Sequence, residues 1–328
     1  MAGEHNRIVG LIGLGYWGKN ILRNLNELGV LHTACDYSSE IIAQRKSEFP
    51  GILYTNRFEE LLEQPEIKAV TIATPAATHY GLSRRALLAD KDVFVEKPLS
   101  LTYQEGQQLV ELAHQQKKIL MVGHLLQYHP AVIVLHDLIA KGTLGSIQYI
   151  YSNRLNIGKL RTEENVLWSF APHDISVILM LVGEEPSRVF AFGGAYVNRG
   201  IVDTTLTTLE FSSSGIRGHI FVNWLHPYKE QKLVVVGSNA MAVFDDCAKD
   251  KLTVYPHTIE IKDGHIPVAH KAEGQAVPLT GQEPLTEELR HFINCVNQRT
   301  VPKTDGREAL RVLSVLEKAT MQLTHNIL

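Results

Sequence analysis

The chain has 328 residues, of which 45% are apolar and 20% are charged, and its formal net charge is -3. This composition is that of a globular protein and excludes a disordered or fibrous class, and the small negative charge argues against a nucleic-acid binder. A chain of this length favours two domains.

The first part of the chain, 1–125, alternates short apolar runs with longer segments of helical spacing. Strands that alternate with helices of this length indicate crossover connections and a doubly wound parallel sheet of the α/β class. The predicted strands are 7–13, 31–36, 68–74, 92–96 and 119–123, and the predicted helices are 20–28, 80–88 and 103–114.

The second part, 126–328, begins with a predicted helix at 130–140 and then changes pattern. Strand-like runs are joined mostly by turn-rich sequence, which predicts an α+β domain with a mostly antiparallel, open-faced sheet. The runs are 146–155, 188–197, 204–211, 217–224 and 232–244. Further helices are predicted at 172–181 and 306–323, the latter packing back toward the first domain, and a long loop is predicted at 263–282.

A glycine motif follows the first predicted strand. Its residues, Gly13-Leu14-Gly15-Tyr16-Trp17-Gly18, precede a predicted helix. In this context the first glycine permits the tight turn, the second lets the backbone approach a pyrophosphate, and the third packs the helix on the strand. Residues 1–125 are therefore predicted to be a dinucleotide-binding Rossmann domain, with Tyr16 and Trp17 among the cofactor contacts.

An acidic residue ends the second predicted strand. Asp36 stands 21 positions after Gly15, where a carboxylate accepts hydrogen bonds from the adenosine ribose. It would repel a 2′-phosphate, and the next residues include no arginine to receive one. The motif favours NAD over NADP; the alternative is a structural turn with a surface aspartate.

Two more strand ends carry candidate residues. Thr74 and Pro75 follow the strand at 68–74, and His79 begins the next helix. Ligands of open α/β sheets bind beyond the carboxyl ends of the strands, so these residues are predicted to border the cofactor. His79 is equally well explained as a residue at the start of a helix.

The strand at 92–96 ends in Glu96, followed by Lys97 and Pro98. By the same rule Lys97 faces the nicotinamide, where an ammonium stabilises a developing alkoxide or, with a lowered pKa, acts as a base. Adjacent residues of a strand face opposite ways, so direct neutralisation of Lys97 by Glu96 is disfavoured.

Together these motifs resemble the Gfo/Idh/MocA oxidoreductases. The resemblance rests on the glycine motif, on Ala-Thr-Pro…His at 73–79 and on Glu96-Lys97-Pro98, and it covers nearly the whole chain. It implies that Lys97 is catalytic, that Glu96 holds the cofactor or the lysine, and that the second domain binds substrate.

The resemblance also implies a second catalytic residue, His173, with Trp168 nearby as a cofactor contact. The family pattern is Asp-x-x-x-His, whereas this chain has Ser169 at the acidic position, which leaves the role of Asp174 open. Ordinary pKa values make a histidine the readier base at neutral pH and a lysine the readier cation. The hypothesis is that His173 removes the proton while Lys97 stabilises the oxygen.

Residues after the strand at 119–123 lie where family members often carry an arginine that touches cofactor or substrate. Gln127 stands there instead. The resemblance suggests contacts through His124, Gln127 and Tyr128, with Gln127 assigned to the cofactor and Tyr128 to the substrate.

The loop after residue 153 is polar and basic. Arg154, Lys159 and Arg161 are candidates to meet a diphosphate, with Asn156 as a further substrate contact, and a solvated basic loop is the equal alternative. The sequence from Arg154 to Asp174 resembles the branch of the family that oxidises the C3 hydroxyl of UDP-N-acetylglucosamine and supplies a 3-keto sugar to an aminotransferase.

Three other functions stay open: a dehydrogenase of a free sugar, inositol or sugar uronate, an NAD-dependent glycosidase, and a non-catalytic NAD-binding regulator. The strands of the second domain offer a face for pairing with another subunit, and the family resemblance implies a homodimer or homotetramer. The three cysteines are far apart and support neither disulfides nor a metal site, and the N-terminus lacks a secretory signal. A soluble, cytoplasmic protein without metal is expected.

Overall fold

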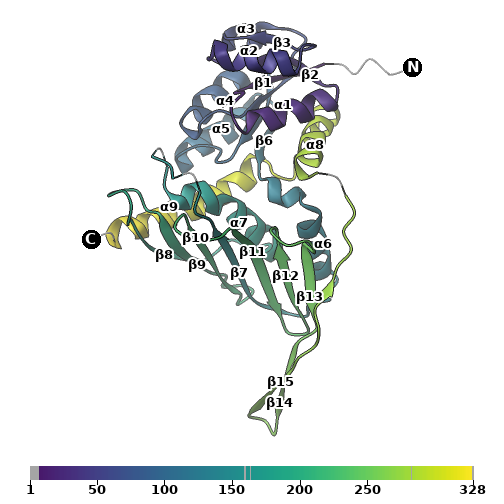
Figure 1. The fold of residues 1–328 in the computed structure, drawn as a ribbon, viewed down its shortest axis with the longest axis vertical. Helices are drawn as coiled ribbons and strands as arrows, with labels where there is room; N and C mark the ends of the chain where they lie inside the picture. The colour runs from purple at the N-terminus through teal and green to yellow at the C-terminus, as the bar shows by residue number, and fades with distance from the viewer. Residues whose placement is uncertain (1–6, 159, 163, 282, 327–328) are drawn as a thin grey trace. The chain divides into compact units, whose positions relative to one another are not determined.

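The computed structural model describes residues 7–158, 160–162, 164–281 and 283–326. It divides into two compact units (Figure 1). The first comprises the described residues of 1–125 and 283–313, and the second those of 126–282 and 314–328. The chain thus returns to its first unit near the end of the sequence.

The first unit contains a six-stranded parallel sheet in the order β3-β2-β1-β4-β5-β6. This is the strand order of a Rossmann fold, with the direction of winding reversed between β1 and β4. The central strands are apolar and buried on both faces, as parallel strands covered by helices require. The strands are β1 (Val9–Ile12), β2 (Leu31–Cys35), β3 (Leu53–Thr55), β4 (Ala69–Ile72), β5 (Asp92–Glu96) and β6 (Leu120–Gly123).

The helices between residues 18 and 115 connect successive strands, as predicted for crossover units, and a further helix, α8, comes near the end of the chain. Their bounds are α1 (Gly18–Glu27), α2 (Ser39–Glu48), α3 (Phe58–Glu63), η1 (Ala76–Thr78), α4 (His79–Leu88), α5 (Tyr103–Gln115) and α8 (Pro284–Gln298). The turn η2 (Leu125–Tyr128) stands where the chain passes to the second unit, and α9 (Gly306–Asn326) belongs to the first unit up to Leu313.

The second unit contains an eight-stranded sheet in the order β16-β13-β12-β11-β7-β10-β9-β8. Only the β10 and β7 pair is parallel among its described pairs, so the sheet is mostly antiparallel, as predicted. Its strands are β7 (Ile147–Leu155), β8 (Arg188–Gly194), β9 (Thr204–Glu210), β10 (Arg217–Asn223), β11 (Glu230–Gly237), β12 (Met241–Asp245), β13 (Leu252–Tyr255) and β16 (Gln275–Ala276).

Two helices accompany this sheet, α6 (Pro130–Ala140) and α7 (Val166–Val182). The predicted start of the second helix at residue 172 is wrong, because Pro172 lies inside α7. The N-cap is Asn165, whose side chain accepts a hydrogen bond from the amide of Trp168. Proline favours the first turn of a helix but does not exclude an interior position, where it removes one backbone hydrogen bond.

The prediction of a loop over 263–282 is also wrong, because this segment contains strands. A hairpin of β14 (Thr258–Lys262) and β15 (Ile266–His270) extends from the sheet (Figure 1), and β16 follows it. Asp263 and Gly264 form its turn with φ of 50° and 74°. Aspartate followed by glycine is a favourable pair for two such residues.

Among the helices that the structure describes, none combines the length and the apolar character of a membrane span. The three cysteines, Cys35, Cys247 and Cys295, are free thiols.

Candidate active site

The glycine loop after β1 has the geometry that a pyrophosphate requires. Gly13 has φ of 91°, and a Cβ at Gly18 would lie 1.9 Å from the carbonyl oxygen of Gly13, so a side chain at either position is strained. A Cβ at Gly15 would meet no atom within 4 Å. The loop therefore packs tightly against α1 through its first and last glycines and leaves its middle open to a ligand. Tyr16, 92% exposed, extends beside it.

Asp36 follows β2 and is nearly buried. Its Oδ2 accepts a hydrogen bond from the amide of Leu14 at 2.7 Å, and its Oδ1 accepts one from the amide of Ser38 at 2.9 Å. Arg45 of α2, which sequence reasoning missed, donates from Nε to the carbonyl oxygen of Leu14 at 3.2 Å. Both the amide and the carbonyl oxygen of Leu14 are thus hydrogen-bonded, which holds the glycine loop in place. The carboxylate of Asp36 lies beside this loop.

His79 connects the ends of β4 and β5. Its Nδ1 lies 2.7 Å from the carbonyl oxygen of Pro98, and its Nε2 lies 2.9 Å from that of Thr74. Both partners are acceptors, so a ring protonated on both nitrogens satisfies both contacts. Thr74 Oγ1 also lies 2.6 Å from Thr78 Oγ1, and Pro75 is exposed between them. His79 is therefore buried between two loops, and its proposed cofactor contact stays a prediction.

The end of β5 is linked to the glycine loop by one hydrogen bond. Trp17 donates from Nε1 to Oε1 of Glu96 at 2.5 Å. Burial raises the pKa of Glu96 to about 7, against the opposing effects of this indole and of Lys97. Lys97 is partly exposed, whereas Pro98 is buried. The strand end thus presents a lysine directly after a half-buried acid that touches the glycine motif.

His124 follows β6 and is buried. Burial and the charge of Lys97 lower the pKa of His124 to about 3, so its ring is neutral. Its Nε2 lies 3.3 Å from Oε2 of Glu308 on α9. Lys97 therefore has a neutral imidazole, rather than a second cation, in its electrostatic surroundings.

In the second unit, Gln127 is buried and donates from Nε2 to Oγ of Ser176 at 2.7 Å. Tyr128 is buried as well. Trp168 donates from Nε1 to Oγ1 of Thr320 on α9 at 3.0 Å. These contacts hold Gln127 and Trp168 within their own unit, and the contacts with cofactor or substrate assigned to all three residues stay predictions.

The two neighbouring residues of α7, His173 and Asp174, differ in environment. Asp174 is buried, and its Oδ2 and Oδ1 accept hydrogen bonds from Arg154 at 2.7 and 3.2 Å. Ser152 donates to Oδ1 at 2.5 Å. His173 lies on the helix beside this cluster and is partly exposed. Asp174 therefore supports β7, and it supplies an anchor for the helix that carries His173.

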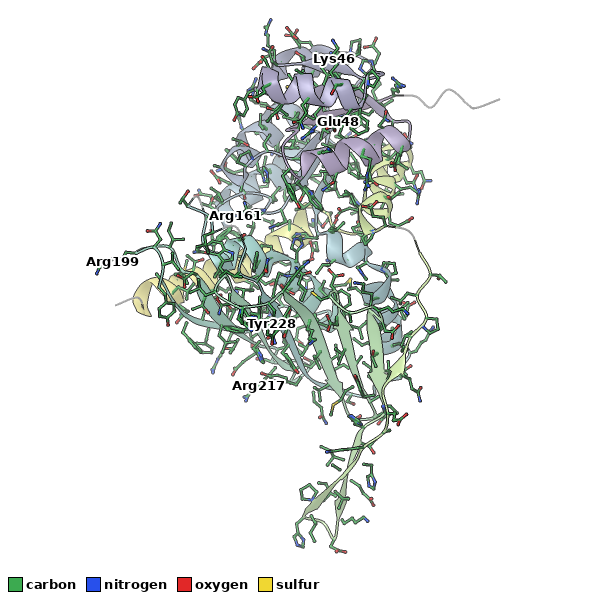
Figure 2. All side chains as sticks on the ribbon, in the orientation of Figure 1. Lys46, Glu48, Arg161, Arg199, Arg217 and Tyr228 are labelled. Atoms are coloured by element: carbon green, nitrogen blue, oxygen red, sulfur yellow. The ribbon has the colours of Figure 1, made fainter. Side chains whose placement is uncertain are left out.

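The residues predicted to contact a diphosphate differ in how accessible they are to a substrate. The guanidinium of Arg154 is buried in its ion pair with Asp174. Arg161, labelled in Figure 2, is about half exposed and pairs with Glu164 at 3.1 Å. Asn156 is partly exposed, and Lys159 lies outside the described residues. Of the described cations, Arg161 is the more accessible to a substrate.

The structure thus groups the predicted residues into two sets. The set in the first unit lies at the ends of parallel strands and comprises Gly13, Gly15, Tyr16, Trp17, Gly18, Asp36, Thr74, Pro75, His79, Glu96 and Lys97. The set in the second unit lies on η2, β7, α7 and the loop between them and comprises Gln127, Tyr128, Arg154, Asn156, Arg161, Trp168 and His173. The first set fits NAD, since the open loop suits a pyrophosphate and Asp36 suits a ribose.

Comparison with known families agrees with this geometry. Residues 7–124 match the family described as "Oxidoreductase family, NAD-binding Rossmann fold", and residues 132–243 match the "GFO/IDH/MocA C-terminal domain". The two matches correspond in order to the Rossmann sheet and to most of the mixed sheet. NAD is therefore the cofactor of this chain.

Individual relatives extend over nearly the whole chain. A UDP-N-acetylglucosamine 3-dehydrogenase from Acidithiobacillus ferrooxidans is 25% identical over 312 residues, which cover 93% of each chain. An oxidoreductase structure from Magnetospirillum magnetotacticum MS-1 is 31% identical with a TM-score of 0.82 and covers 95% of this chain and 98% of its own. An NAD-dependent scyllo-inositol 2-dehydrogenase from Bacillus subtilis is 26% identical, covering 80% of this chain and 77% of its own. The chain belongs to the Gfo/Idh/MocA family of oxidoreductases.

Proposed function

We propose that this protein oxidises the C3 hydroxyl of UDP-N-acetylglucosamine with NAD, forming the 3-keto sugar nucleotide. The observation that carries the dehydrogenase chemistry is the hydrogen bond between Trp17 of the glycine loop and Glu96, which ties the cofactor loop to the residue before Lys97. The sugar nucleotide is supported by the similarity over 93% of the chain to the Acidithiobacillus ferrooxidans enzyme.

In this proposal the chain's own residues handle the proton and the charge. The glycine loop and Asp36 would hold NAD, which would supply the hydride acceptor for the carbon that is oxidised. Lys97 stabilises the alkoxide as the hydroxyl loses its proton, because an ammonium is a preorganised positive charge at the reacting oxygen. His173 accepts the proton, since an imidazole is the readier base near neutral pH. Glu96 holds the strand end against the glycine loop through Trp17.

A 3-keto sugar is a substrate for transamination, so we propose an aminotransferase as the enzyme that consumes the product. The homodimer or homotetramer expected from the sequence is part of the same proposal.

A second candidate is a dehydrogenase of a free sugar, inositol or sugar uronate. This candidate is favoured by the buried ion pair of Arg154 with Asp174, because Arg154 is one of the cations predicted to bind the diphosphate and it is already paired with a carboxylate. The scyllo-inositol dehydrogenase among the relatives agrees with it. A substrate without phosphate needs no cluster of cations, so Arg161 and its neighbours would then be solvated surface.

The test is to incubate the protein with NAD and matched substrates and to follow NADH by absorbance. The panel contains UDP-N-acetylglucosamine, UDP-glucose, free N-acetylglucosamine, myo-inositol and a sugar uronate. The proposal expects NADH with UDP-N-acetylglucosamine and at least tenfold lower kcat/KM without the UDP group. A response to inositol or free sugar alone establishes the second candidate, whereas release of free sugar without net NADH indicates a glycosidase, and no response to any compound favours the regulator.

His173→Ala separates the roles of the two catalytic candidates. If His173 is the base, this variant loses turnover by about a hundredfold or more at neutral pH and recovers part of it as the pH rises. Near-normal turnover in His173→Ala, with loss in Lys97→Ala, would assign the base to the lysine or to water.

A further inference from the structure

Glu288 on α8 is an acid that the reaction proposed above does not use. It has no exposed surface, and neither of its side-chain oxygens has a hydrogen-bond partner among the described residues. An ionised carboxylate in such a place is strongly disfavoured, because burial removes its hydration and nothing replaces it. The residue therefore requires an explanation from its surroundings.

Two contacts fix how α8 lies against β5. The guanidinium of Arg299, at the C-cap of α8, donates to Oδ2 of Asp92 at 2.6 Å. The rings of Phe292 and Phe94 lie 5.7 Å apart between centroids. Asp92 and Phe94 are two residues apart, so they share one face of the strand. The helix thus runs antiparallel to the strand along that face.

The same register continues to Glu96 and Glu288. Glu96 stands two residues beyond Phe94 on the same face of β5, and Glu288 stands four residues before Phe292 on the same stripe of α8. These steps are about 6.6 Å along a strand and about 6 Å along a helix. From these two steps we infer that the two acids lie next to each other, in agreement with the effect of the charge of Glu96 on the pKa of Glu288.

The two acids differ in the groups that support a negative charge. Glu96 accepts a hydrogen bond from Trp17 at 2.5 Å and is followed directly by Lys97. Burial, and then the charge of Glu96, raise the pKa of Glu288 well above its ordinary value. Two carboxyl groups that interact electrostatically do not both ionise readily, so the proton stays on Glu288, which is fully buried and has less support.

The other charged groups around this pair do not change that assignment. His124, after β6, is neutral because burial and Lys97 lower its pKa to about 3. Glu308 of α9 lies beside His124 and adds no positive charge. From α1, Arg23 pairs with Glu283, which precedes the first turn of α8. Lys97 is thus the cation that acts on Glu96.

We propose that Glu288 is a permanently neutral carboxylic acid packed next to Glu96, so that the two acids together carry at most a single negative charge beside Lys97. Glu288 is then a positioning residue, acting through Glu96 on the ammonium of Lys97. The consequence for Lys97 rests on the proposed function, whereas the charge state of the pair is independent of any substrate.

The test uses the full-length protein without substrate, and Trp17 is its probe. Because the indole donates to Glu96, protonation of Glu96 changes the fluorescence of Trp17. The wild type is expected to show a transition near pH 7 that is absent from Trp17→Phe and Glu96→Gln. Glu288→Gln preserves a neutral, polar side chain and is expected to keep the midpoint within about half a pH unit. Glu288→Leu removes the polar partner and is expected to raise the midpoint by about one unit or more.

Two results would overturn the proposal. A fall of the midpoint by more than about one unit in Glu288→Gln would show that Glu288 is ionised in the wild type. An unchanged midpoint in Glu288→Leu would show that the two acids do not interact. If Glu288→Leu does not fold, infrared spectroscopy decides: at pH 8 the wild type is expected to show the carbonyl band of a neutral carboxylic acid that Glu288→Gln lacks, and its absence contradicts the proposal. A failure of the substrate panel leaves all of these readouts intact.

Discussion

Acidic residues at the ends of two strands of the same parallel sheet have contrasting hydrogen-bonding environments. Asp36, after β2, accepts hydrogen bonds from the backbone amides of Leu14 and Ser38, one on each oxygen. Glu96, at the end of β5, has an indole donor on one oxygen, and burial raises its pKa to about 7. The same position in the topology thus holds a carboxylate fixed by backbone amides at one strand and a titratable carboxyl group beside a lysine at the other.

The largest expected effect on turnover comes from substitution of Lys97, which follows Glu96 at the end of β5. Lys97→Ala is expected to reduce kcat on the order of a thousandfold, because the oxygen loses its preorganised cation. NADH affinity, measured by fluorescence, is expected to change by only a few fold. Lys97→Arg is the matched control, since it keeps a positive charge, and partial activity in it indicates the electrostatic role. Near-normal turnover in Lys97→Ala would contradict the assignment.

Glu96→Gln tests whether the carboxyl group of Glu96 titrates near neutral pH in the folded protein. The pKa of Glu96 is raised from 4.5 to about 7, so the folded chain keeps a proton that the unfolded chain releases over this window. The contribution of Glu96 to stability therefore falls as the pH rises from about 4.5 to about 7, by on the order of 3 kcal/mol in total. Thermal unfolding of both proteins at pH 5 and pH 8 measures it. We expect Glu96→Gln to lose less stability than the wild type over this range; equal losses would show that Glu96 does not titrate there.

Asp36→Ala tests the carboxylate after β2, which is held by two backbone amides. It removes the acceptor for Leu14 and Ser38 as well as the proposed ribose contact, so NAD affinity is expected to fall by about ten- to a hundredfold. The measurement is NAD binding by calorimetry. Asp36→Asn, which keeps one acceptor oxygen, is expected to fall between Asp36→Ala and the wild type. Unchanged affinity for NAD in Asp36→Ala would place the ribose elsewhere.

The smallest effect is expected at His79, which connects the loops after β4 and β5. His79→Gln shortens this link and is expected to destabilise the protein by about 1 kcal/mol for each hydrogen bond lost, with a few-fold weaker NAD binding. His114→Gln, at an exposed position on α5, serves as the control in the same thermal unfolding series. If both variants unfold like the wild type, the two contacts of His79 contribute little to stability.

Local patterns in the sequence predicted β1, β2, β4, β5 and β6 and the helices α1, α4 and α5 of the first unit, whereas β3, α2 and α3 were not predicted. The glycine loop, Asp36 and the end of β5 follow from the rule that parallel strands end at one edge of a sheet. The bounds of α6 also agree, since Pro130 stands at its first turn after the cap at His129.

Other features had signals that the sequence reasoning did not use. The apolar spacing of Leu285, Leu289 and Phe292 is that of a helix, but α8 was not predicted. Even with α8 recognised, its packing on β5 is a contact between residues about two hundred positions apart in the chain, for which periodicity carries no information. The role of Glu288 depends on this packing, and that of Arg45 depends on a contact with Leu14, 31 positions away, so both roles required the structure.

The most direct test of the central claim is isotope transfer from the carbon that is proposed to be oxidised. UDP-N-acetylglucosamine carrying deuterium at C3 is incubated with the protein and NAD, and the reduced cofactor is analysed by mass spectrometry. The proposed reaction predicts one deuterium in each NADH formed and a keto group at C3 of the sugar. NADH without deuterium, or no NADH under conditions in which the protein binds NAD, would contradict oxidation at C3 of this sugar nucleotide.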